Sequence, residues 1–217
     1  MVVVGLGGVG SWAAEGLARS AVGHIVLVDF DHIASSNVNR QLHAIEGSFG
    51  KAKVLAMAER LKAINPDITI TMQDVFAKPD NLPDIIPQGS FILDACDDVS
   101  AKVALASFCK SQQIPLVMCG GAGGKIDPTR IQIADLSKTT QDPLLAKIRA
   151  QLRKYHSFSR DLKKSMGIQA VYSFEARRGI ASGGLECSGY GSGVTVTAGF
   201  GFVAAAACLA QIAKLQA

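Results

Sequence analysis

The 217-residue sequence has few features that would hold it together covalently or through a structural metal. Its five cysteines are odd in number and none belongs to a Cys-x-x-Cys pair; they are Cys96, Cys109, Cys119, Cys187 and Cys208. This spacing excludes a paired-cysteine zinc site and a thioredoxin-type redox motif. The odd count, together with the absence of a signal-peptide pattern, favours a reducing cytoplasm.

Charged and aromatic residues are also scarce. Charged residues make up 18% of the chain and aromatic residues 6%, whereas 48% is hydrophobic. A composition this apolar can bury a sizeable core, and the length fits one large domain or one domain with an extension. The net charge of +4 is too small to identify a partner by itself.

The N-terminal stretch has the order strand, glycine turn and helix. An apolar strand at 2–4 is followed at once by the glycines Gly5, Gly7, Gly8 and Gly10. This is a dinucleotide-binding fingerprint, in which the glycines allow a tight turn and close helix packing. Asp29 follows a second apolar strand about 20 residues downstream, where an acid can hold ribose hydroxyls. The glycine pattern alone also fits a nicotinamide oxidoreductase, a methyltransferase or a flavoprotein.

The residues after Asp29 narrow this choice. They supply several hydrogen-bond donors and two ammonium groups: Ser36, Asn37, Asn39, Arg40, Gln41, Lys51 and Lys53. A nicotinamide cofactor has little use for them, because its pyrophosphate already sits on the first helix N-terminus. A nucleoside triphosphate carries more charge and calls for a fork-shaped arginine and a point-charge lysine. Arg40 and Lys53 are therefore candidate phosphate ligands, with ordinary surface charges as the alternative.

A pair of acids follows the fourth expected strand. Asp97 and Asp98 come directly after the apolar run 91–94. Ligands bind at the carboxyl ends of strands in parallel sheets, and carboxylate oxygens suit a hard divalent cation. We expect Asp97 to hold magnesium, the alternative being a turn residue, and Asp98 to cap the next helix.

Alternating helical and strand patterns predict a Rossmann-like, doubly wound α/β fold. We expect helices at 8–20, 51–64, 79–86 and 101–111, and strands at 2–4, 24–28, 68–72, 91–94 and 114–118. Such alternation implies a mainly parallel sheet with helices on both faces and right-handed crossovers. We assign residues 1–124 to a nucleotide-binding domain and 125–217 to a C-terminal extension of the same fold. The glycine-rich loop 120–124 between them wraps a substrate or forms a hinge.

The C-terminal extension begins with a basic segment. Residues 125–190 contain twelve Lys or Arg and six Asp or Glu, a surplus larger than that of the whole chain. A helix starting at Pro143 carries part of this charge, which is typical of polyanion binding or of a solvated helix face. The candidate nucleic-acid residues are Lys147, Arg149, Arg153, Lys154, Arg160, Lys163 and Lys164.

An uncharged tail follows at 187–213. It approaches the length of a membrane span, but small and polar residues dilute its first half. We expect a buried strand and then a small-residue helix at 198–215, serving a core or dimer interface. Membrane association through this tail is the less favoured alternative to a cytoplasmic location.

These motifs together resemble the ubiquitin-activating-enzyme-like adenylating superfamily, which includes activators of the molybdopterin and thiamine sulfur carriers. The segments 120–129 and 135–143 are similar to the branch of tRNA threonylcarbamoyladenosine dehydratases, so the match covers nearly the whole chain. The resemblance implies adenylation of a carboxylate on tRNA by ATP and Mg²⁺, followed by ring closure and release of AMP. The alternative is an adenylating activator of a ubiquitin-like sulfur-carrier protein.

The resemblance also implies roles for individual residues. Arg40, Lys53 and Asp97 are the expected catalytic residues, with Asp97 on magnesium. The expected ATP site comprises Gly5, Gly7, Gly8, Gly10, Asp29, Asp31, Ser36, Asn37, Asn39, Arg40, Gln41, Lys53, Asp97 and Asp98.

The same resemblance bears on partners. The expected partners are tRNA, a second copy of the chain, and a sulfur-transfer protein. The superfamily places an arginine before the first strand that reaches the partner subunit's nucleotide, so we expect an N-terminal segment to be missing here. The absence of Cys-x-x-Cys zinc ligands fits the tRNA branch. Cys187 is either a nucleophile, as in carrier-activating relatives, or a small apolar residue.

Overall fold

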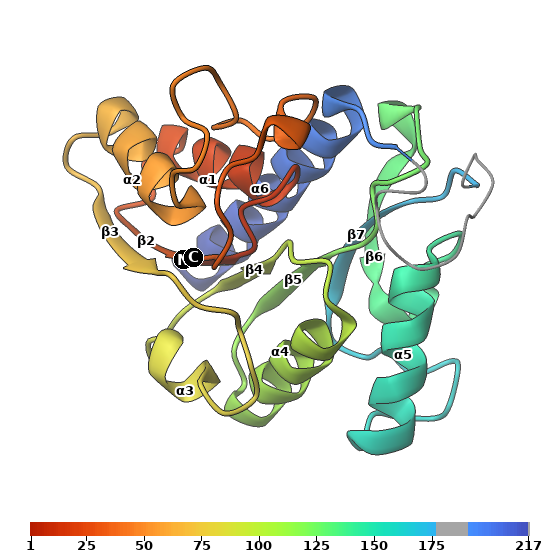
Figure 1. The fold of residues 1–217 in the computed structure, drawn as a ribbon. Helices are drawn as coiled ribbons and strands as arrows, with labels where there is room; N and C mark the ends of the chain where they lie inside the picture. The colour runs from red at the N-terminus through yellow and green to blue at the C-terminus, as the bar shows by residue number, and fades with distance from the viewer. Residues whose placement is uncertain (177–190, 217) are drawn as a thin grey trace.

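The computed structural model describes residues 1–176 and 191–216, and these form an α/β fold built on one sheet (Figure 1). The strands are β1 (Val2–Val4), β2 (His24–Val28), β3 (Thr69–Gln73), β4 (Ile92–Asp94), β5 (Leu116–Cys119), β6 (Ile131–Asp135) and β7 (Gln169–Ser173). The helices are α1 (Gly10–Arg19), α2 (Lys53–Ile64), α3 (Leu82–Ile85), α4 (Val99–Gln112), α5 (Pro143–Tyr155) and α6 (Val194–Gln216).

The sheet has the order β3-β2-β1-β4-β5-β7-β6. All neighbouring pairs are parallel except β6 and β7, which are antiparallel. The chain therefore winds outward in both directions from β1 and β4. The expected doubly wound, mainly parallel sheet is confirmed, and the switch point between β1 and β4 is where such folds bind ligands.

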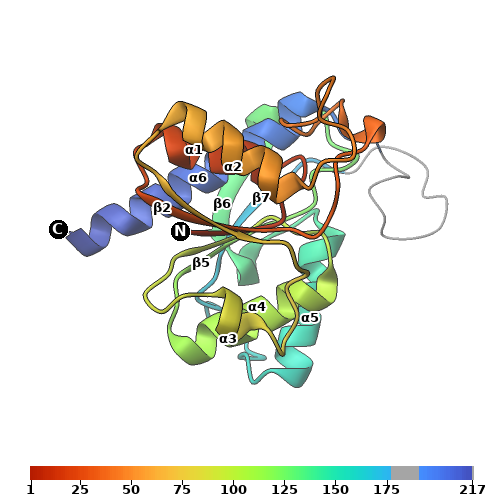
Figure 2. The same cartoon turned by 60° about the vertical axis from the view of Figure 1, so that its left-hand side comes forward.

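Helices cover both faces of the sheet, as Figures 1 and 2 show from two directions. One core contains side chains of α1, α2 and α6, including Leu17, Met57 and Phe200. The core on the other face contains side chains of α3, α4 and α5. The central strands are buried on both sides, with β1 and β4 fully so, which explains their continuous apolar sequences.

Two strands were not predicted from the sequence. β7 lies between β5 and β6, and β6 closes this edge of the sheet. Both strands lie within the basic segment 125–190, which was interpreted from its charge and not from a strand pattern. The C-terminal part of the chain thus adds two strands to the sheet that β1–β5 begin.

The expected strand at the start of the tail is wrong, because α6 already begins at Val194. The glycines of this stretch serve helix packing: a Cβ on Gly201 would lie 2.6 Å from the carbonyl oxygen of Val9, the residue before α1. Residues 194–214 are long and apolar enough to cross a membrane, but 44% of that window is buried within the fold. α6 packs against α1 and the sheet, as a core helix does.

Candidate functional site

A cavity of about 930 Å³ opens at the carboxyl ends of the central strands. Its lining includes Val4, Val28, Ala95 and Gly120, which end or directly follow β1, β2, β4 and β5. This is the switch point of the sheet. The volume is within the ~300–1,000 Å³ typical of small-molecule sites.

The glycine turn between β1 and α1 forms one wall of the cavity. Gly5 has φ +86°, and a Cβ there would lie 2.7 Å from the backbone nitrogen of Cys96. A Cβ on Gly10 would lie 1.7 Å from the Gly5 carbonyl oxygen. Gly7 and Gly8 line the cavity, and a Cβ on Gly7 would have no atom closer than 3.9 Å. The sequence therefore needs glycine at 5 and 10 for packing and offers a bare backbone surface at 7.

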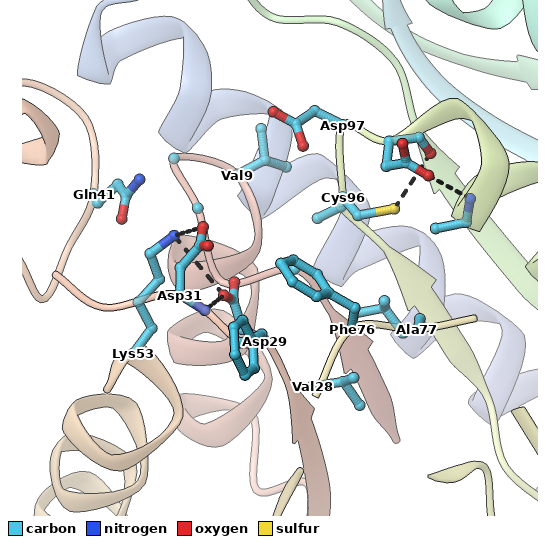
Figure 3. Close-up of a pocket in the computed structure, with 18 of the residues that line it drawn as sticks. Val9, Val28, Asp29, Asp31, Gln41, Lys53, Phe76, Ala77, Cys96 and Asp97 are labelled. Carbon is cyan, nitrogen blue, oxygen red and sulfur yellow. Dashed lines mark hydrogen bonds and ion pairs between the residues drawn. The ribbon is translucent and has the colours of Figure 1, made fainter. Parts of the chain in front are cut away.

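Asp29 lies at the end of β2 beside a buried lysine (Figure 3). Its Oδ2 accepts the Leu6 N–H at 2.6 Å and its Oδ1 accepts the Asp31 N–H at 2.8 Å. Lys53 Nζ lies 2.7 Å from Asp31 Oδ2 and 3.8 Å from Asp29 Oδ1. Burial raises the pKa of Asp29, and Lys53 and the backbone donors offset only part of that rise. Each Asp29 oxygen retains capacity to accept a hydroxyl group.

Arg40 faces the glycine turn from the segment after β2. A Cβ on Gly8 would meet the Arg40 Cγ at 3.1 Å, so the arginine stem lies over that glycine. Its guanidinium donates to the Ser36 carbonyl at 3.0 Å and to Asn39 Oδ1 at 2.9 Å. Trp12 Nε1 of α1 donates to the Arg40 carbonyl at 2.9 Å, which ties this segment to the helix.

The other predicted residues of this segment divide into two groups. Asn37 and Gln41 line the cavity, whereas Ser36 and Asn39 hold Arg40 and do not line it. Asn39 Nδ2 instead donates to the Ser192 carbonyl at 2.6 Å, which joins this segment to the entry of α6.

The acids after β4 have different roles. Asp98 is the N-cap of α4, and its side chain accepts the Ala101 N–H at 2.7 Å. Asp97 is exposed and lines the cavity, and within the described residues its carboxylate makes no hydrogen bond or ion pair. The capping role expected for Asp98 is thus present, while Asp97 is the carboxylate that faces the cavity (Figure 3).

Four helices begin at the cavity. Val9, Ala101, Leu144 and Thr197 line it, and they lie at the N-termini of α1, α4, α5 and α6. Asp98 and Asp142 cap α4 and α5, but α1 has no side-chain cap. A helix N-terminus carries roughly half a positive charge, and α1 keeps free N–H groups because no side chain caps it, so this end of the cavity favours an anion such as a polyphosphate.

Several lining residues were not predicted. Phe30 and Phe76 pair with ring centroids 4.7 Å apart and give the cavity an apolar, aromatic part. His43 was not predicted either; it does not line the cavity, is 4% exposed, and neither ring nitrogen has a partner in the part of the chain described. Burial, and then the charge of Lys53, lower the pKa of His43 to about 4. No local pattern marks these residues, since they depend on which loops meet.

The glycine loop 120–124 is held closely by α5. The Gly121 N–H donates to Asp142 Oδ2 at 2.9 Å, and a Cβ on Gly120 would lie 2.1 Å from the same oxygen. The Gly124 N–H donates to the Gly191 carbonyl at 3.0 Å. Residues 120–123 of this loop line the cavity, which is where a loop that wraps a substrate would lie.

The seven predicted nucleic-acid residues do not converge on the cavity. α5 starts at the cavity with Leu144, and its 13 residues carry the chain about 20 Å away. Five of the seven are exposed along and beyond α5: Lys147, Lys154, Arg160, Lys163 and Lys164.

The other two make internal contacts. Arg149 contacts Thr139 Oγ1 and the Leu136 carbonyl, and burial lowers its pKa. Arg153 donates to the Ser159 carbonyl at 3.2 Å. These contacts direct both side chains inward, away from a polyanion. Cys187 lies outside the described residues.

ATP and magnesium can be tested against these observations. The bare glycine turn, Asp29, two cations and the buried Gln41 Oε1, which has no partner in the described part, form a set of groups that a nucleotide would satisfy. For magnesium, no group of three or more His, Cys, Asp or Glu is found among the described residues. A cation at Asp97 would therefore take its other oxygens from phosphate and water, as Mg²⁺ does in nucleotide sites.

Comparison with known proteins agrees with this geometry. The sequence pattern of the ThiF family matches residues 1–216. A tRNA threonylcarbamoyladenosine dehydratase of Haemophilus influenzae is 44% identical over 98% of this chain and 85% of its own length. A crystal structure of the Escherichia coli tRNA N6-threonylcarbamoyladenosine dehydratase with ATP is 45% identical, with a TM-score of 0.91 over 99% of this chain and 86% of that one. The structure of the same enzyme with AMP is 44% identical, with a TM-score of 0.91 over 100% of this chain and 87% of that one.

Proposed function

This chain belongs to the ThiF family, and from that premise we propose that it is an ATP-dependent enzyme that dehydrates threonylcarbamoyladenosine in tRNA to its cyclic form. The observation that carries this conclusion is the cavity at the switch point, where Asp29, Arg40, Lys53 and Asp97 surround a bare glycine turn. Relatives similar over nearly the whole chain carry this activity in their names, and one has been crystallised with ATP and with AMP.

In the proposed reaction, the threonylcarbamoyl carboxylate attacks the α-phosphorus of ATP and pyrophosphate leaves. Ring closure at the activated carbonyl then expels AMP, so one oxygen of the carboxylate departs on AMP and the nucleoside loses one water. Carboxylate oxygen is a poor leaving group and AMP is a good one. ATP therefore supplies the driving force, and the chain binds and orients the reactants.

The site residues divide this work. Asp29 accepts the ribose hydroxyls, since each of its oxygens has spare acceptor capacity. Lys53 and Arg40 place positive charge beside the phosphates, together with the free N–H groups at the start of α1. Asp97 would hold Mg²⁺, which when bound neutralises charge on the phosphates. Phe30 and Phe76 offer an apolar surface for a purine.

The exposed basic residues beyond the cavity would contact the tRNA body. The modified nucleotide must enter the cavity, whereas the rest of the tRNA extends well past it. Lys154 and Lys163 lie in the exposed group about one helix length away. Replacing both by glutamine should weaken tRNA binding. The slope of the logarithm of the binding constant against the logarithm of the salt concentration should become shallower by about one per lost contact. Lys62→Gln, at an exposed lysine of α2, is the control; equal effects of the two changes would contradict this surface.

The activity is tested with ATP, Mg²⁺ and tRNA that carries threonylcarbamoyladenosine. We expect AMP release and a fall of one water in the mass of the nucleoside. An unchanged nucleoside mass with folded, ATP-binding protein would refute the proposal. The sulfur-carrier alternative predicts pyrophosphate exchange that depends on the C-terminal glycine of a carrier protein, which the same preparation can test.

We also propose a cytoplasmic homodimer. Phe202 of α6 is 48% exposed and packs edge-on against Trp12 of α1, so these two helices present an apolar surface that a second copy could cover. Light scattering on the purified chain tests the oligomeric state, and a monomer at micromolar concentration would contradict it. A sulfur-transfer partner stays a prediction from the resemblance.

A further inference from the structure

A buried charged pair lies beneath the cavity. Lys102 of α4 and Asp94 of β4 are both 0% exposed, and Lys102 Nζ lies 3.0 Å from Asp94 Oδ2 in an ion pair. Nζ also donates to the Cys119 carbonyl at 2.8 Å and lies 3.5 Å from the Asp94 carbonyl. Burial would lower the pKa of Lys102, but Asp94 raises it overall, so the side chain is an ammonium ion at neutral pH.

Stability alone does not account for this pair. Removing two charges from water is unfavourable, and apolar residues of similar volume usually fill such a space equally well or better. The pair therefore calls for a role in fixing local geometry.

Lys102 joins the ends of two neighbouring strands. β4 ends at Asp94, where the Asp97 turn begins, and β5 ends at Cys119, where the glycine loop begins. Asp94 is paired with Met118 across the two strands. Because Lys102 contacts both strand ends from the first half of α4, it links the helix to the roots of two loops that line the cavity.

The turn that carries Asp97 is held on both sides. Asp94 Oδ1 accepts the Cys96 N–H at 3.2 Å and the Cys96 thiol at 3.0 Å. Burial, and then Asp94, raise the pKa of Cys96, which keeps it a thiol that can donate. Asp98 caps α4 directly after Asp97. The Asp97 carboxylate makes no hydrogen bond or ion pair of its own among the described residues, so the backbone of this turn sets its position.

We propose that Lys102, with Asp94 as its counter-charge, is a positioning residue that fixes the Asp97 carboxylate for Mg²⁺·ATP. This inference rests on the proposed function, in which Asp97 holds the metal. The Lys102 side chain does not touch the nucleotide; it acts by holding the ends of β4 and β5 and the start of α4 in register. A substitution at Lys102 that displaces these strand ends would move Asp97 without removing any atom of the metal site.

The test uses the double variant Asp94→Asn with Lys102→Met in the full chain. Asparagine retains an oxygen for the Cys96 N–H, and methionine fills the lysine stem without a charge. The matched control is Lys110→Met, an exposed lysine near the end of the same helix that contacts the Ser157 carbonyl. ATP binding is measured by calorimetry without metal and across a Mg²⁺ titration, together with AMP release.

We expect metal-free ATP binding to change by no more than about two-fold in the double variant, while the Mg²⁺ concentration for half-saturation rises about 10-fold. Losing a residue that orients a metal ligand typically has an effect of about 10–100-fold. Lys110→Met should alter neither quantity. A double variant with unchanged Mg²⁺ dependence would overturn the proposal.

A mutant cycle that combines the double variant with Asp97→Ala tests whether Lys102 acts through Asp97. If Lys102 acts through Asp97, the double replacement should change AMP release by less than about two-fold once Asp97 is absent. If the fold-losses in AMP release of the double variant and of Asp97→Ala multiply when the changes are combined, the proposal is overturned. Should the double variant fail to fold, Lys102→Arg retains the charge but not the compact geometry and should raise the Mg²⁺ requirement similarly. Failure of the wild type to bind Mg²⁺·ATP would instead reject the proposed function.

Discussion

The packing of the glycine turn leads to a prediction whose size follows from the structure. Gly10 is the first residue of α1, and a Cβ there would lie 1.7 Å from the Gly5 carbonyl oxygen and 3.1 Å from the Ala95 Cβ. The nearest obstacle is backbone, which cannot rotate away. In Gly10→Ala the helix would have to move by roughly 2 Å to reach an ordinary contact distance.

Overpacking of this kind costs ~3 kcal/mol when backbone must move. The helix propensity of alanine offsets up to about 1 kcal/mol. We therefore expect Gly10→Ala to lower the free energy of unfolding by about 2 kcal/mol and Tm by about 4–8 °C, given the size of the chain. ATP affinity should fall as well, because α1 carries one wall of the cavity.

Thermal and denaturant unfolding followed by circular dichroism measure the loss of stability. Gly23→Ala is the matched control, because nothing lies within 4 Å of a Cβ at that position. We expect its Tm to differ from wild type by no more than about 1 °C. If Gly10→Ala is as stable as Gly23→Ala, the argument that α1 packs against the turn through Gly10 is refuted.

Three further predictions concern the cavity and its surroundings. Gly7→Ala should keep the wild-type Tm, because the nearest atom to its Cβ is 3.9 Å away, yet weaken ATP binding measured by calorimetry; unchanged affinity would show that the nucleotide avoids this wall. Asp97→Ala should slow AMP release by ~10²-fold or more with an unchanged Tm, and an active variant would remove Asp97 from the metal site. His43 has a folded pKa of about 4, below its unfolded value of 6.5, so its stabilising effect is complete above pH 6.5 and is lost as pH falls towards 4. The loss should approach roughly 3 kcal/mol in denaturant titrations, and His43→Leu should flatten that pH dependence; an unchanged slope would contradict the buried neutral imidazole.

The nucleotide-binding half was predictable because its signals are local. The strand 2–4, the glycine turn and Asp29 follow one another within 29 residues, and the fold brings their backbone and side chains together as the fingerprint requires. The triphosphate preference could be inferred from Arg40 and Lys53 because both lie between β2 and β3, on the segment that follows Asp29. Both residues line the cavity.

The C-terminal half was less predictable because its roles depend on distant contacts. β7 could not be recognised from pattern, since four of its five residues are buried between β5 and β6 and give no amphipathic signal. Arg149 has the same charge as its neighbours, and only its contact with Thr139 shows that it is directed inward. In the sequence Lys102 likewise resembles a surface lysine, and only the fold places its ammonium group beside Asp94 and the Cys119 carbonyl.

The hydrogen bonds from Asn39 to Ser192 and from Gly124 to Gly191 have a consequence for how the enzyme becomes competent during synthesis. The proposed phosphate-binding groups all lie before residue 99, but the wall that these bonds complete is supplied by Gly191 and Ser192. A nascent chain halted before residue 191 should therefore hold nucleotide poorly, although every charged residue of the site has already been translated.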